Sequence, residues 1–158
     1  MSHVTAGTEL RAANRDDINF ILATWLKSFR GSDVSRGIPS EILFSEHQNL
    51  IKNILLNSTV TMLVSSEDST QILGYIVHDI NLPIVHYIYV KYPYRKLGLA
   101  RHLFNNFYND RFELNQHIHC THRTNYSRWG DLKDKYKLVY NPYLLELSYA
   151  KSNQGIPS

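Results

Sequence analysis

A basic, glycine-containing turn stands near the middle of the sequence, at Arg95-Lys96-Leu97-Gly98-Leu99-Ala100. The apolar run Ile84–Val90 before it is rich in β-branched and aromatic residues, which predicts a buried strand. Apolar spacing after it, as far as Tyr108, predicts a helix. The first N–H groups of a helix lack intrahelical acceptors and bind anions, and a glycine lets the backbone approach such a ligand closely. The sequence therefore predicts an anion cradle at this turn.

A second group of chemistry-bearing side chains lies at His117, His119, Cys120 and His122. Such residues can hold a metal ion, but this segment alternates like a strand. Alternation would put His117 and His119 on one face and would leave Cys120 and His122 on the other, with Ile118. The spacing also fits no standard zinc pattern. We therefore expect no metal site here.

A strand and two helices should precede the turn and its strand. Thr8–Ala12 predicts a short opening strand, and Asn14 with Asp17 three residues later resembles a capping box that begins a helix. Apolar residues then recur at spacings of three and four until a glycine ends the pattern. Ser40–Leu56 repeats the helical spacing, with His47 on its apolar stripe.

Strands should flank the turn on both sides. The period switches to two at Thr59–Val64, and Gln71–Ile80 predicts the second strand of a hairpin, with Gly74 as a bulge. Hairpins supply antiparallel pairs and the crossover helix supplies a parallel pair, so the order of elements predicts an α/β domain with a mixed sheet. The elements predicted after the turn are a strand beginning at Gln116, a short helix at Asn125–Lys137, and strands at Lys137–Tyr140 and Tyr143–Tyr149.

The turn resembles motif A of the GNAT superfamily of acyl-CoA-dependent N-acyltransferases, [QR]-x-x-G-x-[GA], through Arg95-x-x-Gly98-x-Ala100 with Val90 five residues before the arginine. The predicted order of elements matches that family's topology, so the likeness extends over most of the chain. The sequence has neither the P-loop nor the G-x-G-x-x-G dinucleotide fingerprint. The resemblance implies an α/β (α+β) fold with a GNAT-like mixed, mostly antiparallel sheet of six to seven strands, flanked by about four helices.

The resemblance also implies that acetyl-CoA is the acyl donor. Its pyrophosphate would bind the backbone amides of the turn at the positive end of the helix dipole. Its pantetheine arm would follow the strand before the turn, exposed by a splay from the next strand, where N–H groups could stabilise an oxyanion. The residues assigned to the cofactor on this basis are Ile88, Tyr89, Val90, Arg95, Lys96, Leu97, Gly98, Leu99, Ala100, Arg101 and Asn125.

Acyl transfer to an amine requires a base, because neutralising an amine with a pKa near 10.4 at pH 7 costs about 4 to 5 kcal/mol. His86, nine residues before Arg95, is the base-type side chain near the start of the central strand. Alternation would place it on the same face as Ile88 and Val90. The alternative is a histidine that packs against the sheet and bonds to the backbone.

A tyrosine usually protonates the thiolate in this family, in a segment resembling N-x-x-A-x-x-x-Y-x-x-x-G-[FY]. Asn125 fits the start of that segment, but Leu132 stands in place of the tyrosine and Tyr136-Lys137 in place of the closing pair. Tyr126 and Tyr136 are substitutes by their proximity in sequence. A thiolate with a pKa near 8.5 also leaves unaided at modest cost.

Two functions therefore stay open. One is an N-acetyltransferase that transfers an acetyl group by direct attack of a primary amine on a small molecule, peptide or protein. The other is a non-catalytic GNAT-fold protein with a binding or structural role, as in some phage-encoded members. The retained motif A favours the first, and the departures after Asn125 favour the second.

The composition suits one globular domain. At 158 residues and 43% hydrophobic, the chain can bury a core, and we expect the domain at residues 1–150 with a frayed tail at 151–158. The single cysteine, the lack of a signal peptide and the lack of a membrane-length apolar run predict a cytoplasmic protein. A net charge of +3 is too dilute for a dedicated nucleic-acid binder. The expected partner is an amine acceptor, and a homodimer is left open.

Overall fold

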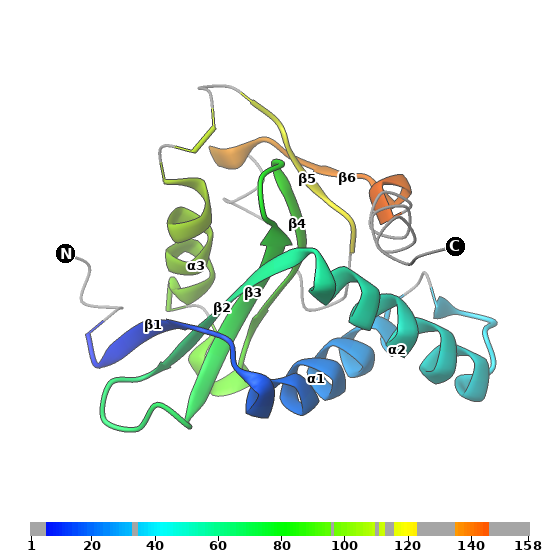
Figure 1. The fold of residues 1–158 in the computed structure, drawn as a ribbon, viewed down its shortest axis with the longest axis horizontal. Helices are drawn as coiled ribbons and strands as arrows, with labels where there is room; N and C mark the ends of the chain where they lie inside the picture. Colours follow the sequence, from blue (N-terminus) through cyan, green and yellow to red (C-terminus); the bar gives the residue numbers. More distant parts are fainter. Residues whose placement is uncertain are drawn as a thin grey trace, which may run out of the picture.

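The computed structural model describes residues 6–32, 35–95, 97–109, 111–112, 116–122 and 135–145. These residues form one six-stranded sheet in the order β1-β2-β3-β4-β5-β6 and three α-helices (Figure 1). The helices are α1 (Ile18–Arg30), α2 (Ser40–Leu56) and α3 (Leu99–Tyr108). The strands are β1 (Thr8–Ala12), β2 (Ser58–Ser65), β3 (Ile72–Asp79), β4 (Ile84–Val90), β5 (Ile118–Cys120) and β6 (Leu138–Tyr140).

The sheet is mixed, as predicted. The pairs β1–β2, β2–β3 and β3–β4 are antiparallel. The pairs β4–β5 and β5–β6 are parallel. Parallel neighbours require a crossover connection, and the chain between β4 and β5 supplies one that contains α3. The predicted bounds of β1, β4 and α2 are confirmed.

A bulge lies beside Gly74, as predicted. Leu63 of β2 pairs with Gly74, but the next residue pairs with Ile72, so Leu73 is the extra residue. A Cβ at Gly74 would run into the carbonyl oxygen of Tyr89 on β4. The glycine is therefore required by the close approach of β3 and β4.

The predicted capping box is confirmed at the entrance to α1. The Asn14 side chain accepts from the backbone N–H of Asp16 at 2.9 Å, and the Asp17 carboxylate accepts from the backbone N–H of Asn14 at 2.8 Å. Arg11 donates to both oxygens of that carboxylate, at 2.6 and 2.9 Å. These bonds from Arg11 are the main cause of the lowered pKa of Asp17. They tie the end of β1 to the start of the first helix.

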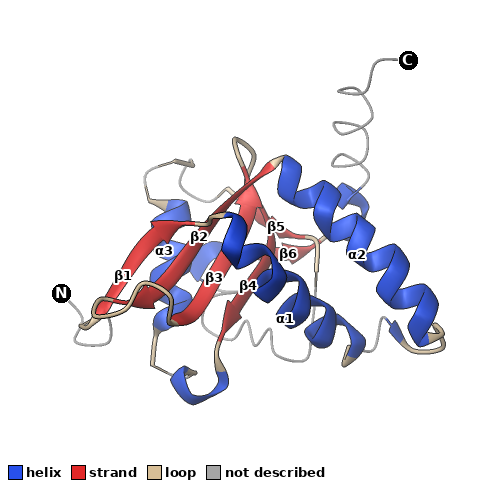
Figure 2. Ribbon diagram, turned by 60° about the horizontal axis from the view of Figure 1, so that its bottom comes forward, coloured by secondary structure: helices blue, strands red, loops and turns tan. Residues whose placement is uncertain are grey.

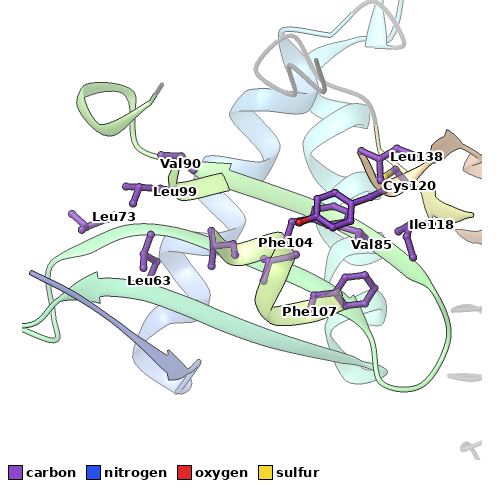
Figure 3. Packing of buried hydrophobic residues seen from close by; sticks show 13 residues of the cluster. Leu63, Leu73, Val85, Val90, Leu99, Phe104, Phe107, Ile118, Cys120 and Leu138 are labelled. Carbon is purple, nitrogen blue, oxygen red and sulfur yellow. The ribbon is translucent and has the colours of Figure 1, made fainter. Parts of the chain in front are cut away.

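The helices cover the two faces of the sheet. α1 and α2 lie on one face, and α3 lies on the other (Figure 2). Figure 3 shows the core under α3, which we call the α3-side cluster. Its buried members are Leu63, Leu73, Ile76, Val85, Val90, Leu99, Leu103, Phe104, Phe107, Ile118, Cys120, Tyr136 and Leu138. The α1-side cluster contains Ile21, Leu22, Trp25, Leu26, Ile51, Ile54, Met62, Val64, Tyr75, Val77 and Tyr87.

The predicted seventh strand at Tyr143–Tyr149 is wrong in its first residues. Pro142–Leu144 is a 3-10 helix and Leu145 continues in the helical region, because proline has a fixed φ that suits the first turn of a helix. Residues 146–149 lie outside the described chain, as does most of the helix predicted at Asn125–Lys137. In the described part of the chain, no helix is both long and apolar enough to cross a bilayer.

Candidate functional site

β4 and β5 run together for only a short distance. They pair at Ile84 with His119 and at Val85 with Cys120, and the Thr121 N–H then donates to the Val85 carbonyl at 3.2 Å. β4 continues to Val90, whereas β5 ends at Cys120. β4 therefore extends past the end of β5 by the segment from His86 to Val90.

The backbone of this segment faces two ways. Lys91 donates its N–H to Leu73 on the β3 side at 2.8 Å. Because alternate residues of a strand direct their N–H and C=O groups to opposite sides, Ile88 and Val90 direct theirs away from β3. The strand edge beside these two residues can accept an extended ligand as an additional strand.

The turn after β4 has the conformation that an anion cradle requires. Gly98 is the N-cap of α3 with φ of 79°, in the left-handed region that favours glycine. Gly98 has no side chain with which to cap the helix start, and the first intrahelical bond runs from His102 N–H to the Gly98 carbonyl at 3.0 Å. The N–H groups of Leu99, Ala100 and Arg101 are therefore the first of the helix and have no acceptor within it. Leu97 and Arg101 are exposed beside them, and Lys96 lies outside the described residues.

Arg95 joins the turn to the end of β4. Its Nε donates to the Val90 carbonyl at 2.7 Å. Its guanidinium carbon lies 5.9 Å from the ring centre of Tyr89 and 5.6 Å from that of Tyr92. The side chain is thus held over the strand end, so its charge has a defined position next to the start of α3.

His86 lies at the apex where β4 and β5 part. The pairing of β3 with β4 slips there, because Val77 is opposite Tyr87 while His78 is opposite Val85. His86 is the extra residue of this bulge, so strict alternation does not continue through it. The prediction that His86 shares a face with Ile88 and Val90 depends on that alternation and therefore loses its basis. The side chain of His86 is 2% exposed, and its Nδ1 lies 2.9 Å from the Thr121 hydroxyl oxygen.

Tyr136 lies in the α3-side cluster. Its ring centre is 4.6 Å from that of Phe104 and 5.1 Å from that of Tyr108. Its hydroxyl is buried with no hydrogen-bond partner in the described structure, and burial is the main cause of its raised pKa. The structure therefore gives a protonated phenol among the apolar side chains under α3. Tyr126 and Asn125 lie outside the described residues.

No protein-family model and no curated protein matches the chain. Solved structures do match it, and two of them align over most of its length. A possible acetyltransferase from Clostridium difficile 630 aligns with a TM-score of 0.55 and 16% identity over 85% of this chain and 93% of the other. A proposed acetyl transferase from Pyrococcus furiosus aligns with a TM-score of 0.56 and 15% identity over 96% of this chain and 93% of the other.

The fold is GNAT-like. At 15 to 16% identity the likeness establishes the architecture alone, so the roles of individual residues depend on their geometry. The GNAT-like fold of this chain has the expected order of elements, with an early pair of helices and a glycine turn between β4 and α3.

The structure also shows a buried polar group that the sequence did not reveal. The Thr121 hydroxyl contacts both His86 Nδ1 and His122 Nδ1, the latter at 3.2 Å. His122 Nε2 in turn lies 3.0 Å from His47 Nε2 on α2. We call these four side chains the histidine line.

Aromatic rings surround the outer half of this line. Phe29 stacks on His47 with ring centres 3.7 Å apart, and Trp25 meets the His122 ring edge-on at 4.9 Å. Burial lowers the pKa of His47 to about 4 and, as the largest cause, lowers that of His122 well below its usual value. Both imidazoles are therefore neutral at pH 7.

Strand alternation predicts His122 on the face of Ile118 and Cys120, and this prediction is wrong. β5 ends at Cys120, and the chain then turns so that His122 packs against α1 and α2 instead. One signal for the contact was available, since His47 occupies an apolar-stripe position of α2, where a buried imidazole needs a polar partner. In the described residues, no group of three or more potential ligands could hold a metal ion.

Proposed function

We propose that the chain is an N-acetyltransferase that moves an acetyl group from acetyl-CoA to a primary amine of a small molecule, peptide or protein. One observation carries the proposal. The part of β4 that extends past the end of β5 leads directly into the helix start at Gly98. A strand edge for an amide-containing arm and an anion cradle for its phosphates thus follow one another along the chain.

The pyrophosphate of the donor would bind the N–H groups of Leu99, Ala100 and Arg101. Lys96, Leu97 and Gly98 would complete the turn around it, and the positioned guanidinium of Arg95 would add charge. The amides of the pantetheine arm would pair with the backbone of Ile88 and Val90, on either side of Tyr89. Asn125 is retained in this proposal as a further contact, on the resemblance alone.

The reaction is a direct attack. The neutral amine nitrogen attacks the thioester carbonyl, the new C–N bond forms, the C–S bond breaks, and CoA leaves as a thiolate. Backbone N–H groups of β4 would stabilise the oxyanion of the tetrahedral intermediate. The amine loses one proton, and His86 at the apex of β4 and β5 would receive it. Because His86 is only 2% exposed, the proton would pass through one intervening water molecule.

The sequence offers two candidate acids that could protonate the thiolate, Tyr126 and Tyr136. The Tyr136 hydroxyl is protonated and has no partner in the described structure, which suits a donor, but it is buried in the α3-side cluster. The thiolate can also leave without an acid.

A GNAT-fold protein without catalysis is the second candidate. It is favoured by Leu132 at the place of the usual tyrosine and by the burial of Tyr136 to 3% exposure. Such a protein would retain the cradle and bind the donor, or would have lost both.

Calorimetric titration with acetyl-CoA tests the proposal. We expect saturable binding that is weakened at least tenfold by Arg95→Glu and by Gly98→Asp, since each adds a negative charge at the phosphates. Lys52→Glu on the exposed side of α2 makes the same change of charge far from the turn. Gly37→Asp controls for backbone strain, because Gly37 has φ of 83° with nothing near its Cβ position.

Absence of binding to the native protein would overturn the proposal. Release of free thiol from acetyl-CoA in the presence of spermidine, phenethylamine or a lysine peptide would separate the two candidates. Binding without turnover on such amines would favour the non-catalytic protein.

A further inference from the structure

We propose that the exposed ring of Tyr92 stacks on the adenine base of the acetyl-CoA donor. The inference rests on the proposed function, because that function supplies the donor. It deepens that function by assigning the base of the nucleotide to a residue that lies outside both the strand edge and the helix start.

The proposed positions of the arm and the phosphates indicate where the nucleoside must lie. The arm would follow β4 at Ile88 and Val90, and the pyrophosphate would bind at the start of α3. The acyl end of the arm then points toward His86, and its phosphate end lies beyond Val90. Adenosine is attached at the end of the pyrophosphate that is remote from the arm. The base therefore lies beside the segment that joins β4 to α3.

This joining segment begins with the 3-10 helix η4 (Tyr92–Tyr94). Tyr94 donates its N–H to the Lys91 carbonyl at 2.9 Å, and Arg95 donates its N–H to the Tyr92 carbonyl at 3.2 Å. Pro93 has a fixed φ in the middle of the turn. The backbone of Tyr92 thus has a defined position relative to the end of β4.

Tyr92 differs from the two tyrosines on either side of it. Tyr89 packs against the α1-side cluster, and Tyr94 packs against the α3-side cluster. Tyr94 also accepts a hydrogen bond from Gln71 Nε2 at 3.4 Å. Tyr92 belongs to neither cluster and is 78% exposed. Its neighbours therefore serve packing, whereas the Tyr92 ring is presented to solvent.

Arg95 holds the exposed ring of Tyr92. The guanidinium carbon lies 5.6 Å from the centre of that ring and 5.9 Å from the centre of the Tyr89 ring. Nε of the same side chain donates to the Val90 carbonyl at 2.7 Å. Because these contacts restrain the Tyr92 ring before a ligand arrives, stacking of a flat group on it costs less conformational entropy.

A restrained, exposed phenol ring beside a guanidinium suits a purine base. Bases stack on aromatic rings and on the plane of an arginine side chain, and this contact requires no particular pattern of donors and acceptors. The same guanidinium would interact with the phosphates of the donor. Arg95 would thus support the ring that binds the base and also place a positive charge beside the pyrophosphate.

Substitutions of Tyr92 and shortened donors test the contact together. Tyr92→Ala removes the ring, whereas Tyr92→Phe and Tyr92→Trp retain a stacking surface. Tyr143→Ala is the matched control, because Tyr143 is 80% exposed and also lies in a proline-containing 3-10 helix, Pro142–Leu144. The donors are acetyl-CoA, acetyl-dephospho-CoA, which lacks the 3′-phosphate, and S-acetyl-phosphopantetheine, which lacks adenosine and one phosphate of the pyrophosphate.

Calorimetry gives the affinity of each variant for each donor. We expect Tyr92→Ala to weaken binding of acetyl-CoA and of acetyl-dephospho-CoA by about tenfold each, as loss of one base–aromatic stack predicts. Binding of S-acetyl-phosphopantetheine should change by less than about twofold, because this donor has no base to stack. Tyr92→Phe, Tyr92→Trp and Tyr143→Ala should bind acetyl-CoA within about threefold of native.

NMR of the native protein with acetyl-CoA gives a direct readout. We expect nuclear Overhauser effects between the H2 and H8 protons of adenine and the ring protons of Tyr92, which are assigned by their loss in Tyr92→Ala. Native protein that binds acetyl-CoA without these effects would overturn the base contact and leave the proposed function intact.

The affinities can overturn the base contact in three further ways. Tyr92→Ala could bind acetyl-CoA as tightly as Tyr143→Ala does, which would leave the ring without a role. Equal weakening for all three donors would assign the effect to displacement of Arg95. A loss confined to acetyl-CoA would assign it to the 3′-phosphate. Native protein that binds none of the three donors would instead remove the proposed function, and the base contact with it.

Discussion

The two faces of the sheet hold their helices in different ways. α3 is attached by packing of apolar side chains, with Leu99, Leu103, Phe104 and Phe107 buried against the sheet. The helices of the other face are also attached by hydrogen bonds between side chains. Tyr75 bonds to Thr24, Tyr87 bonds to Ser28, and His122 bonds to His47.

This difference separates two requirements of the proposed function. The α3 face needs only to fix the helix start beside β4, and packing against a rigid sheet is sufficient for that. Hydrogen bonds have defined directions, so the α1 face can hold particular polar atoms in line. Changes to the first face should therefore alter stability, whereas changes to the second should also alter the response to pH.

The largest loss of stability is expected on the α3 face. Phe104 is 1% exposed, and Phe104→Ala removes its ring and leaves a cavity, which should cost about 4 kcal/mol of unfolding free energy. Urea denaturation measures this loss. Leu56→Ala is the control, since Leu56 is 74% exposed at the end of α2 and should change stability by less than about 0.5 kcal/mol. A loss below about 1 kcal/mol for Phe104→Ala would contradict the packing described for α3.

The α1 face should make the protein sensitive to acid. The folded pKa of His47 is about 4, below its unfolded value of about 6.5, so the unfolded chain binds more protons between these values. Stability is therefore complete above pH 6.5 and falls as the pH drops toward 4. His47 alone should account for about 3 kcal/mol between pH 7 and pH 4.

Urea denaturation at pH 7, 5.5 and 4 measures this loss in the native protein and in His47→Gln. Burial also lowers the pKa values of His78 and His122, so some acid sensitivity should remain in the variant. His102→Gln removes a half-exposed histidine of α3 as the control. Equal losses in native protein and His47→Gln would show that His47 is not the origin of the effect.

The sequence predicted local features better than long-range ones. The bounds of α2, the capping box at Asn14 and the glycine turn at Gly98 depend on neighbouring residues, and each is confirmed. The face of His86 depends on a bulge that forms only against β3. The contact of His122 with His47 joins residues 75 positions apart, and no local pattern encodes it.

The predicted seventh strand shows a different kind of error. Its tyrosines favour a strand. Pro142 nevertheless opens a 3-10 helix over the first residues. The prediction gave more weight to the composition of the segment than to this proline, which is a local signal for a helical turn. The sequence predicted the glycine turn at Gly98, which depends on neighbouring residues. It did not predict the contact of His122 with His47, because that contact forms only when the fold brings α2 to the end of β5.

A smaller effect should follow removal of one hydroxyl from the α1 face. Tyr87 is 3% exposed and donates to the Ser28 hydroxyl oxygen at 2.5 Å. Tyr87→Phe leaves this buried oxygen without that donor, which should cost about 1 to 2 kcal/mol in urea denaturation. The ring should remain stacked on Trp25, whose centre lies 5.0 Å away. A variant as stable as the native protein would show that this bond does not help to hold α1.

The same substitution on the α3 face should have the opposite sign. Tyr136 is also 3% exposed, but its hydroxyl has no hydrogen-bond partner in the described structure. Tyr136→Phe removes a polar group whose burial is uncompensated, so stability should rise by about 1 kcal/mol, while the contacts of the ring with Phe104 and Tyr108 remain. Thiol release by the same variant tests the proposed acid, because a fall of tenfold or more in kcat with unchanged acetyl-CoA binding would assign that role to Tyr136. Unchanged kcat with increased stability would exclude Tyr136 as the acid and would show that its hydroxyl has no part in the transfer.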